Sequence, residues 1–217
     1  MNIIWKDNLS LWNDVVSKSP GKARPYDNRG YVFDKRGEFE NAIADYAKAI
    51  EINPNYAIPH FGRGIVYGKL GQFENSVADL TDAIALEPYN ANAYSHRGIA
   101  EGNLGKWDKA LADFCRVIII DSTVALEYFN RGFAYANLGN KNKAIQDFSR
   151  AIAKGYTATR VYAFRGMAYA SLLQWDKAIA DYNIALQADP GNEVVAEQKE
   201  IAEKHLKDTG NPLPNAN

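Results

Sequence analysis

The sequence predicts an all-α protein, a right-handed solenoid of antiparallel helix hairpins, and three observations support this prediction. An Arg-Gly pair recurs with a constant step of 34 residues, and an aspartate follows each arginine at a fixed distance. Apolar residues between these markers repeat at helical spacing. The composition, 47% hydrophobic and 24% charged over 217 residues, is typical of a globular protein and excludes disorder and collagen.

The repeat markers keep their phase through five copies. The arginines are Arg29, Arg63, Arg97, Arg131 and Arg165, and the aspartates are Asp45, Asp79, Asp113, Asp147 and Asp181. Equal numbers in fixed phase favour ion pairs between neighbouring helices over a ladder of arginines that binds an anionic ligand. We therefore assign these arginines and aspartates a structural role.

Each unit of 34 residues predicts two helices joined by a tight turn. In the first unit, Tyr26, Gly30 and Phe33 share one helical face, and Gly37 supplies the turn. The apolar face of the second helix consists of Ala42, Tyr46, Ala49 and Ile50. This helix ends before Pro54, because proline cannot continue it. Neither helix can bury its apolar face alone, so successive hairpins must stack.

These units resemble tetratricopeptide repeats, which carry small residues at unit positions 8 and 20, aromatic residues at positions 4, 11 and 24, and proline at position 32. The resemblance implies complete repeats at 23–56, 57–90, 91–124, 125–158 and 159–192. The sequence departs from the pattern at Glu101 in an aromatic position, at Ser122 and Tyr156 in place of proline, and at Leu173 in place of the turn glycine. These departures concern local turns and leave the predicted fold unchanged.

Both ends extend beyond the five repeats. Trp12 and Pro20 stand 34 residues before Tyr46 and Pro54, so residues 1–22 predict a half repeat that retains only its second helix. That helix would leave Trp5 and Trp12 on an apolar edge. An unrelated amphipathic helix is the alternative. Residues 193–207 predict a terminal capping helix, and residues 208–217 predict a flexible tail.

No catalytic or cofactor motif is recognisable. The histidines His60, His96 and His205 lack a second histidine or cysteine at helical ligand spacing, so no metal site is predicted. Phosphate-binding loops and nucleophile elbows are absent from the sequence. The single cysteine, Cys115, follows the packing position Phe114 and is expected to be a structural thiol. The sequence therefore predicts a protein without catalysis, cofactor or metal.

The resemblance implies that the first helices line a concave groove. The helix face left free by the packing residues comprises unit positions 2, 5, 6, 9 and 13. On this face we predict the partner-binding residues Asn28, Tyr31, Phe61, Ile65, Lys69, His96, Ile99, Phe129, Asn130, Phe133, Phe164 and Met167. Phe61 and Phe129 are expected to be solvent-facing anchors. The alternative is that these side chains pack on neighbouring helices.

Two binding modes of the family can be compared with these positions. The clamp for a chaperone's C-terminal carboxylate needs lysine and asparagine at positions 5 and 9, where the first repeat has Asp27 and Tyr31, so no such partner is expected. An asparagine ladder that grips a peptide backbone needs asparagine at position 6 of every repeat. Only Asn28 and Asn130 match, so the ladder is incomplete.

The predicted function is a non-catalytic scaffold that binds a protein or peptide segment in its groove. A net charge of −1 indicates no nucleic-acid partner, and no apolar run is long enough to insert into a membrane. The opening run from Trp5 to Pro20 is similar to the junction at which multi-spanning membrane glycosyltransferase-like proteins enter a C-terminal tetratricopeptide domain. This implies an alternative, a substrate-presenting domain outside the cytoplasm, whereas a stand-alone protein would be cytoplasmic. Self-association through the N-terminal edge is a further expectation.

Overall fold

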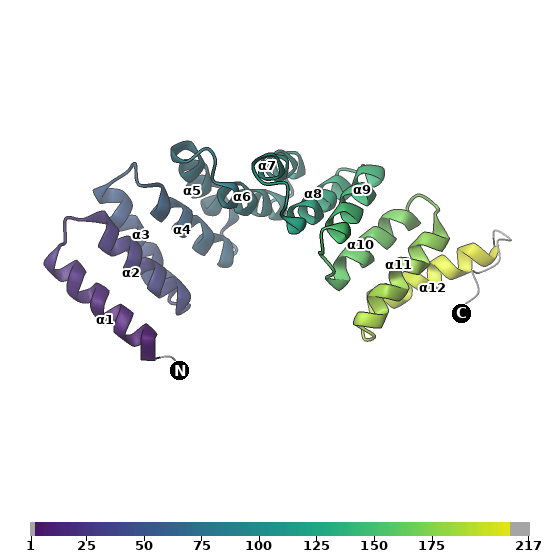
Figure 1. Cartoon of the computed structure of the whole chain (residues 1–217), viewed down its shortest axis with the longest axis horizontal. Helices are drawn as coiled ribbons and strands as arrows, with labels where there is room; N and C mark the ends of the chain where they lie inside the picture. The colour runs from purple at the N-terminus through teal and green to yellow at the C-terminus, as the bar shows by residue number, and fades with distance from the viewer. Residues whose placement is uncertain (1–2, 209–217) are drawn as a thin grey trace. The chain divides into compact units, whose positions relative to one another are not determined.

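The computed structural model describes residues 3–208, with side chains from Leu9 onward. Across this range the regular structure is entirely α-helical and comprises twelve helices (Figure 1), which confirms the predicted all-α class. The protein divides into two compact units, Met1–Lys106 and Trp107–Asn217. Each unit buries its apolar residues between consecutive helices.

The described part of the first unit is a stack of hairpins. Its helices are α1 (Ile3–Lys18), α2 (Ala23–Lys35), α3 (Phe39–Ile52), α4 (Ala57–Lys69), α5 (Phe73–Leu86) and α6 (Ala91–Asn103). The pairs α2–α3 and α4–α5 each form an antiparallel hairpin (Figure 1). Helix α1 packs on α2, α3 packs on α4, and α5 packs on α6.

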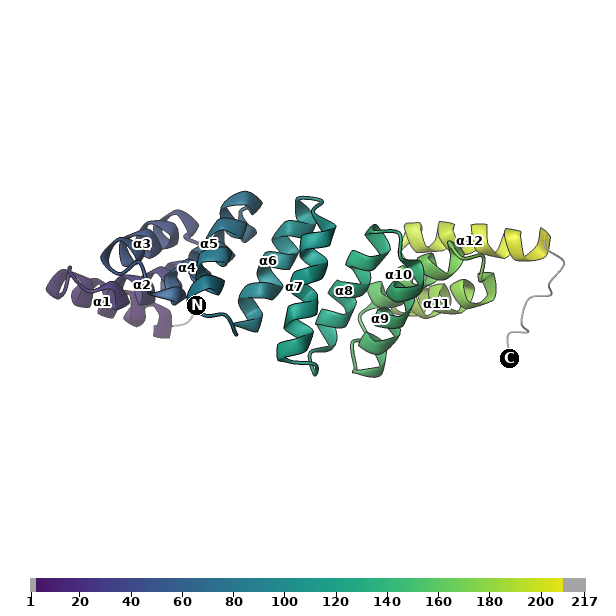
Figure 2. The same ribbon diagram turned by 90° about the horizontal axis from the view of Figure 1, so that it is seen from above.

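The described part of the second unit repeats this arrangement. Its helices are α7 (Trp107–Ile120), α8 (Ala125–Asn137), α9 (Lys141–Ala153), α10 (Thr159–Ala170), α11 (Trp175–Ala188) and α12 (Glu193–Asp208). The pairs α8–α9 and α10–α11 form hairpins, α7 packs on α8, and α9 packs on α10. Helix α12 lies along α11 and covers the end of the stack (Figure 2). The predicted repeat 91–124 is divided between the two units.

The hairpin turns require a left-handed residue, and most of them use glycine. Gly37 and Gly71 have φ angles of 75° and 71°. The turn between α10 and α11 keeps this geometry with Leu173, whose φ is 58°. A non-glycine residue in this conformation costs about 1–2 kcal/mol. Leu173 is 71% exposed, so packing recovers little of that cost.

The recurring glycine of the Arg-Gly pair marks the place where the two helices of a hairpin approach most closely. A Cβ atom on Gly64 would lie 2.8 Å from Leu80 Cγ, and one on Gly166 would lie 2.6 Å from Tyr182 Cε1. Both distances are shorter than a Cβ contact can be. A small residue at this position is therefore a condition for the bulky residue opposite to fill the core.

Arginine–aspartate pairs join the two helices of a hairpin in four repeats. In each pair the arginine Nε and Nη2 atoms donate to the two carboxylate oxygens at distances from 2.6 to 2.9 Å. The pairs are Arg29–Asp45, Arg63–Asp79, Arg131–Asp147 and Arg165–Asp181, with every aspartate buried. They have the geometry that a structural role requires. Arg97 and Asp113 lie in different units, and their pairing stays a prediction.

The third nitrogen of the guanidinium group reaches back to the preceding repeat. Arg29 Nη1 donates to Asn13 Oδ1 at 3.0 Å, Arg97 Nη1 to Thr81 Oγ1 at 3.1 Å, Arg131 Nη1 to Cys115 Sγ at 3.9 Å and Arg165 Nη1 to Ser149 Oγ at 3.0 Å. The position that would receive Arg63 is Ala47, whose methyl group offers no acceptor. Each of these arginines except Arg63 thus links two successive repeats.

The two terminal helices cover the ends of their units. On α1, Val16 is buried and Trp12 is partly buried, while the side chain of Trp5 lies outside the described residues. On α12, Val195, Ala202 and Leu206 are buried against α11. The predicted tail, 208–217, lies outside the described residues apart from Asp208.

In the part of the protein that the structure describes, no helix combines the length and the apolar character needed to cross a bilayer.

Candidate binding groove

A pocket of about 600 Å³ opens on the first unit, where the first helices of successive repeats lie next to one another. Helices α2 and α4 supply most of its lining, and α6 supplies His96. The lining residues are Arg24, Asp27, Asn28, Tyr31, Asp34, Lys35, Tyr46, Tyr56, Ile58, Phe61, Gly62, Ile65, Lys69 and His96. The pocket therefore lies on the helix face at which the sequence predicts a groove.

The apolar part of the pocket depends on a missing side chain. A Cβ atom on Gly62 would lie 2.6 Å from Cζ and 2.9 Å from the hydroxyl oxygen of Tyr46. Glycine at this position lets the buried Tyr46 ring reach the pocket from α3. Phe61 and Ile65, both partly exposed, flank this point on α4. The result is an exposed apolar surface of aromatic and aliphatic carbon, a feature typical of interaction sites.

The polar rim is held by a charged contact between α2 and α4. Lys69 Nζ donates to Asp34 Oδ1 at 2.6 Å and to Asp34 Oδ2 at 2.8 Å. Lys35, by contrast, makes a looser contact, with its Nζ 5.1 Å from the centroid of the Tyr31 ring. Lys69 therefore fixes the spacing of the two helices, while the half-exposed Tyr31 ring remains accessible to a partner.

A buried carboxylate lies in the wall of the pocket. Asp27 Oδ2 accepts a hydrogen bond from the Tyr56 hydroxyl at 2.8 Å. Burial raises the pKa of Asp27, an effect that the Tyr56 hydrogen bond and the nearby Arg24 charge only partly offset. Burial and then the bond to Asp27 raise the pKa of Tyr56 to about 12. A carboxyl group with a perturbed pKa in a pocket is a recurrent feature of functional sites.

His96 closes one end of the pocket. Its ring meets Phe61 edge to face, with 5.9 Å between the ring centroids. Desolvation by the surrounding groove, and then the positive charge of Lys69, lower the pKa of His96 from its usual 6.5. A smaller cavity of about 220 Å³ continues beyond it, lined by Ile99 among others. The groove thus extends along α6.

A separate cluster on the same unit could hold a metal ion. Among the described residues, the potential metal ligands that come close enough together are His60, Asp79 and Asp82. Their ligand atoms lie within 4.8 Å of one another. The cluster lies on α4 and α5 and shares no residue with the groove.

Three models of the tetratricopeptide repeat (TPR) match the sequence. A TPR repeat matches residues 30–71, and two further tetratricopeptide repeat models match residues 61–125 and 125–155. Together the matches run without a gap from residue 30 to residue 155.

The protein belongs to the tetratricopeptide repeat family.

Solved structures show the same fold. YrrB, described as a TPR protein with an unusual peptide-binding site, has a TM-score of 0.79 and 21% identity, with 87% of this protein and 97% of YrrB covered. A structure of MamA has a TM-score of 0.72 and 22% identity, with 89% of this protein and 98% of the MamA chain covered. A structure of MamA from residue 41 to its end, from Desulfovibrio magneticus RS-1, has a TM-score of 0.74 and 18% identity, with 78% of this protein and 96% of that fragment covered. No curated protein matches the sequence.

The TPR groove brings together the predicted residues of the first unit. Six of them, Asn28, Tyr31, Phe61, Ile65, Lys69 and His96, line the larger pocket, and Ile99 lines the smaller one. Of these, Tyr31 is 52% exposed. Their role in binding remains a proposal. The common lining follows from the TPR register, because positions 2, 5, 6, 9 and 13 of consecutive first helices share one face.

In the second unit the expectation for Phe129 is wrong. Phe129 is only 6% exposed and is a core residue, not a solvent-facing anchor. Phe133 and Phe164 pack against it, with ring centroids 6.4 and 6.0 Å away. Asn130 and Met167 are partly buried as well. The alternative interpretation, packing on neighbouring helices, therefore holds for Phe129.

Three lining residues of the TPR groove lie outside the helix face that sequence analysis assigned to it. Asp34 stands outside the five groove positions, Tyr46 was expected only in the core, and Tyr56 lies in the connection before α4. Tyr56 carried a usable signal, because the same unit position holds no other aromatic residue in the sequence. The cluster of His60, Asp79 and Asp82 was also missed, since its ligands come from two helices.

Proposed function

We propose that the TPR groove of the first unit binds an extended peptide segment and that the protein acts as a non-catalytic interaction scaffold. The observation that supports this most directly is the pocket of about 600 Å³, which is lined by six residues that the repeat register predicts. Small apolar pockets with a few polar groups are the usual form of a peptide side-chain site.

The arrangement of the pocket indicates how such a segment would bind. An apolar residue of the peptide would lie against Phe61, Ile65 and the ring of Tyr46. The Asn28 amide carries both a donor and an acceptor, which match the carbonyl oxygen and the amide N–H of an extended peptide backbone. Asp27 would accept a hydrogen bond from a donor of the peptide, which would favour its ionised form.

The fold comparison agrees with this proposal at the level of the family. The TPR protein YrrB, whose structure covers 87% of this protein, is described as having a peptide-binding site. TPR repeats are in general interaction scaffolds, and the sequence contains no catalytic motif. The proposal therefore assigns the protein a binding role without chemistry.

The test uses a phage-displayed library of random peptides, selected on the immobilised full-length protein. Enriched peptides are then synthesised, and their binding is measured by isothermal titration calorimetry. Ile58→Asp is the test variant, because Ile58 lines the pocket and is 50% exposed. Ile119→Asp is the matched control, because Ile119 is 73% exposed on the second unit and outside the pocket.

We expect Ile58→Asp to weaken binding by more than about tenfold, because a carboxylate in an apolar contact must be desolvated. Ile119→Asp should bind as the parent protein does. Equal binding by both variants, or the absence of any enriched peptide, would contradict the proposal. Circular dichroism of both variants verifies that the helices remain intact.

A further inference from the structure

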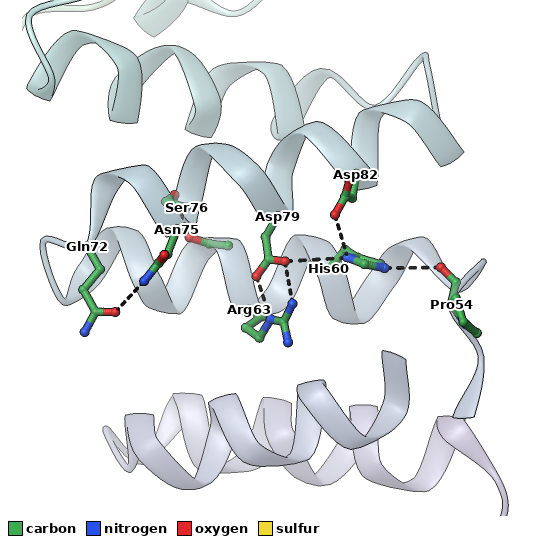
Figure 3. A network of polar contacts seen from close by, with 9 residues as sticks. Pro54, His60, Arg63, Gln72, Asn75, Ser76, Asp79 and Asp82 are labelled. Carbon is green, nitrogen blue, oxygen red and sulfur yellow. Dashed lines mark hydrogen bonds and ion pairs between the residues drawn. The ribbon is translucent and has the colours of Figure 1, made fainter. Parts of the chain in front are cut away.

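His60 points an unsatisfied ring nitrogen at two carboxylates. Its Nε2 atom lies 3.3 Å from the Pro54 carbonyl oxygen, which can only accept, so Nε2 carries the hydrogen of this contact. Nδ1 lies 3.7 Å from Asp79 Oδ1 and 3.7 Å from Asp82 Oδ2 (Figure 3). His60 is 7% exposed, and Nδ1 has no hydrogen-bond partner among the described residues. In a neutral ring the Nδ1 lone pair therefore faces negative charge.

The other four repeats show which residues usually stand at the positions of His60 and Asp82. Unit position 4 is tyrosine in the four other repeats, at Tyr26, Tyr94, Tyr128 and Tyr162, and is histidine only at His60. Unit position 26 is Lys48 in the first repeat, Arg116 in the third, Arg150 in the fourth and Ile184 in the fifth, but Asp82 in the second. The second repeat thus changes both positions together, toward groups that coordinate metals.

The second repeat also carries less positive charge around its arginine–aspartate pair than the fourth repeat does. In the fourth repeat Arg150 Nη1 lies 3.2 Å from Asp147 Oδ1, so this aspartate has a second cation beside its paired arginine. In the second repeat that cation is replaced by the carboxylate of Asp82. The arginine, the aspartate and the residue at position 26 therefore carry a formal charge of +1 in the fourth repeat and −1 in the second. A cation bound beside His60 would restore the balance.

We infer that His60 Nδ1, Asp79 Oδ1 and Asp82 Oδ2 form a site for a divalent transition-metal ion of the Zn²⁺ type. Imidazole and carboxylate are ligands that such ions prefer, and two atoms about 2.1 Å from one ion can lie up to about 4.2 Å apart. The two separations of 3.7 Å satisfy this limit. Asp82 is exposed, so its carboxylate has room to adjust, and water can complete the coordination.

The surroundings of the site already hold two of its ligands in place. The bond from His60 Nε2 to the Pro54 carbonyl is the kind of outer contact that fixes a metal-binding imidazole. Arg63 donates to both oxygens of Asp79 at 2.7 Å, and a carboxylate oxygen with one such bond retains a further lone pair. The ion would join the start of α4 to α5 and does not depend on the peptide groove.

The experiment titrates the full-length protein, without a polyhistidine tag, with Zn²⁺ alone in a calorimeter. Co²⁺ serves as a spectroscopic probe, because its visible absorption reports coordination by nitrogen and oxygen ligands. The variants take residues from other repeats: His60→Tyr introduces the usual residue of position 4, and Asp82→Arg the residue found at Arg150. Both should fold, since other repeats already accommodate these residues at the same positions. His96→Asn is the matched control at a histidine outside the cluster.

We expect one Zn²⁺ per protein molecule and a rise in melting temperature that a chelator reverses. His60→Tyr and Asp82→Arg should each weaken Zn²⁺ binding by more than about tenfold and abolish the Co²⁺ spectrum. His96→Asn should leave both unchanged. The proposal is overturned if the parent protein fails to bind Zn²⁺, or if His60→Tyr and Asp82→Arg bind it as the parent does.

Discussion

Phe61 and Phe129 occupy the same unit position, two repeats apart, yet one lines a pocket and the other belongs to a core. Phe61 is partly exposed beside the apolar pocket of the first unit. Phe129 is buried within the second unit. The two helices that carry these residues, α4 and α8, follow the same register and each pack against the second helix of their hairpin. The difference therefore lies in the side chains around each ring, both within the hairpin, where Phe133 and Phe148 contact Phe129, and in the residues that follow it.

Three side chains that follow the α8–α9 hairpin cover Phe129. The rings of Tyr156 and Phe164 lie 5.1 and 6.0 Å from the Phe129 ring, and the Arg160 guanidinium lies 4.9 Å from its centroid. The equivalent residues after Phe61 are Pro88, Asn92 and His96. Of these, His96 contacts Phe61. A groove position is thus open or closed according to the segment that enters the next repeat, which one hairpin alone does not reveal.

The largest effect that tests this comparison is the loss of the buried ring. Phe129→Ala should lower the free energy of unfolding by about 3–5 kcal/mol, because it removes a ring that is almost fully enclosed. Phe61→Ala should cost about 1 kcal/mol, since its ring is only partly removed from water. Urea unfolding followed by circular dichroism measures both. Equal losses in the two variants would show that Phe61 is also core.

A smaller effect should follow from closing the groove of the first unit. His96→Phe introduces the residue that stands at this position in the fifth repeat, Phe164. An aromatic pair with Phe61 should stabilise the protein by about 0.5–1 kcal/mol. The same change should weaken binding of any peptide selected on the parent protein. Normal peptide binding by this variant would show that His96 takes no part in binding.

The pH dependence of this variant has a defined sign. The pKa of His96 in the folded state lies below the usual 6.5, so the unfolded state takes up the proton first as the pH falls. This histidine therefore removes stability as the pH falls through 6.5, and His96→Phe should show a shallower loss between neutral pH and about pH 5. Parallel melting curves of parent and variant over that range measure the difference. Identical slopes would contradict the assignment.

An effect of the same size as that of His96→Phe is expected in the turns, in which the two units also differ. The described part of the first unit has glycine at its left-handed positions, whereas the second unit has Gly139 and Gly155 at two such positions and Leu173, with a φ of 58°, at another. Leu173→Gly should stabilise the protein by about 0.5–1 kcal/mol. The substitution relieves the backbone strain, and the greater conformational entropy of glycine in the unfolded state offsets part of that gain. Leu138→Gly is the matched control, because Leu138 has a φ of −79° and gains nothing from glycine. A loss of stability in Leu173→Gly would mean that packing of the leucine side chain outweighs the strain.

The repeat made the helices predictable, and the limits of prediction lie where repeats meet. Gly37 and Pro54 mark element ends through their own backbone restrictions, so helix boundaries follow from local sequence. The prediction for Phe129 failed because three of the side chains that cover it, Tyr156, Arg160 and Phe164, lie beyond its own hairpin. The exposure of a residue depends on such contacts, which register alone does not specify.

In the candidate sites, too, positions on one helix could be predicted and contacts between helices could not. The groove face could be predicted because it depends on helical spacing within first helices, as for Asn28 and Ile65. Tyr46 enters the pocket only because Gly62 lacks a side chain, a contact between successive repeats. The carboxylates near His60 come from another helix, where spacing rules for ligands on one helix do not apply.

The guanidinium links between repeats have a consequence for cooperative unfolding. In a linear array, the probability that one unit melts while its neighbour stays folded depends on the interfacial coupling between nearest neighbours. Arg29, Arg97, Arg131 and Arg165 each add a hydrogen bond to that coupling, whereas the position equivalent for Arg63 is Ala47, at the boundary of the first and second repeats. The arginine contribution to the coupling is missing at that boundary, where the TPR groove lies and where the Lys69–Asp34 contact joins α2 to α4. Subglobal opening at this boundary would therefore break the Lys69–Asp34 contact but no arginine link.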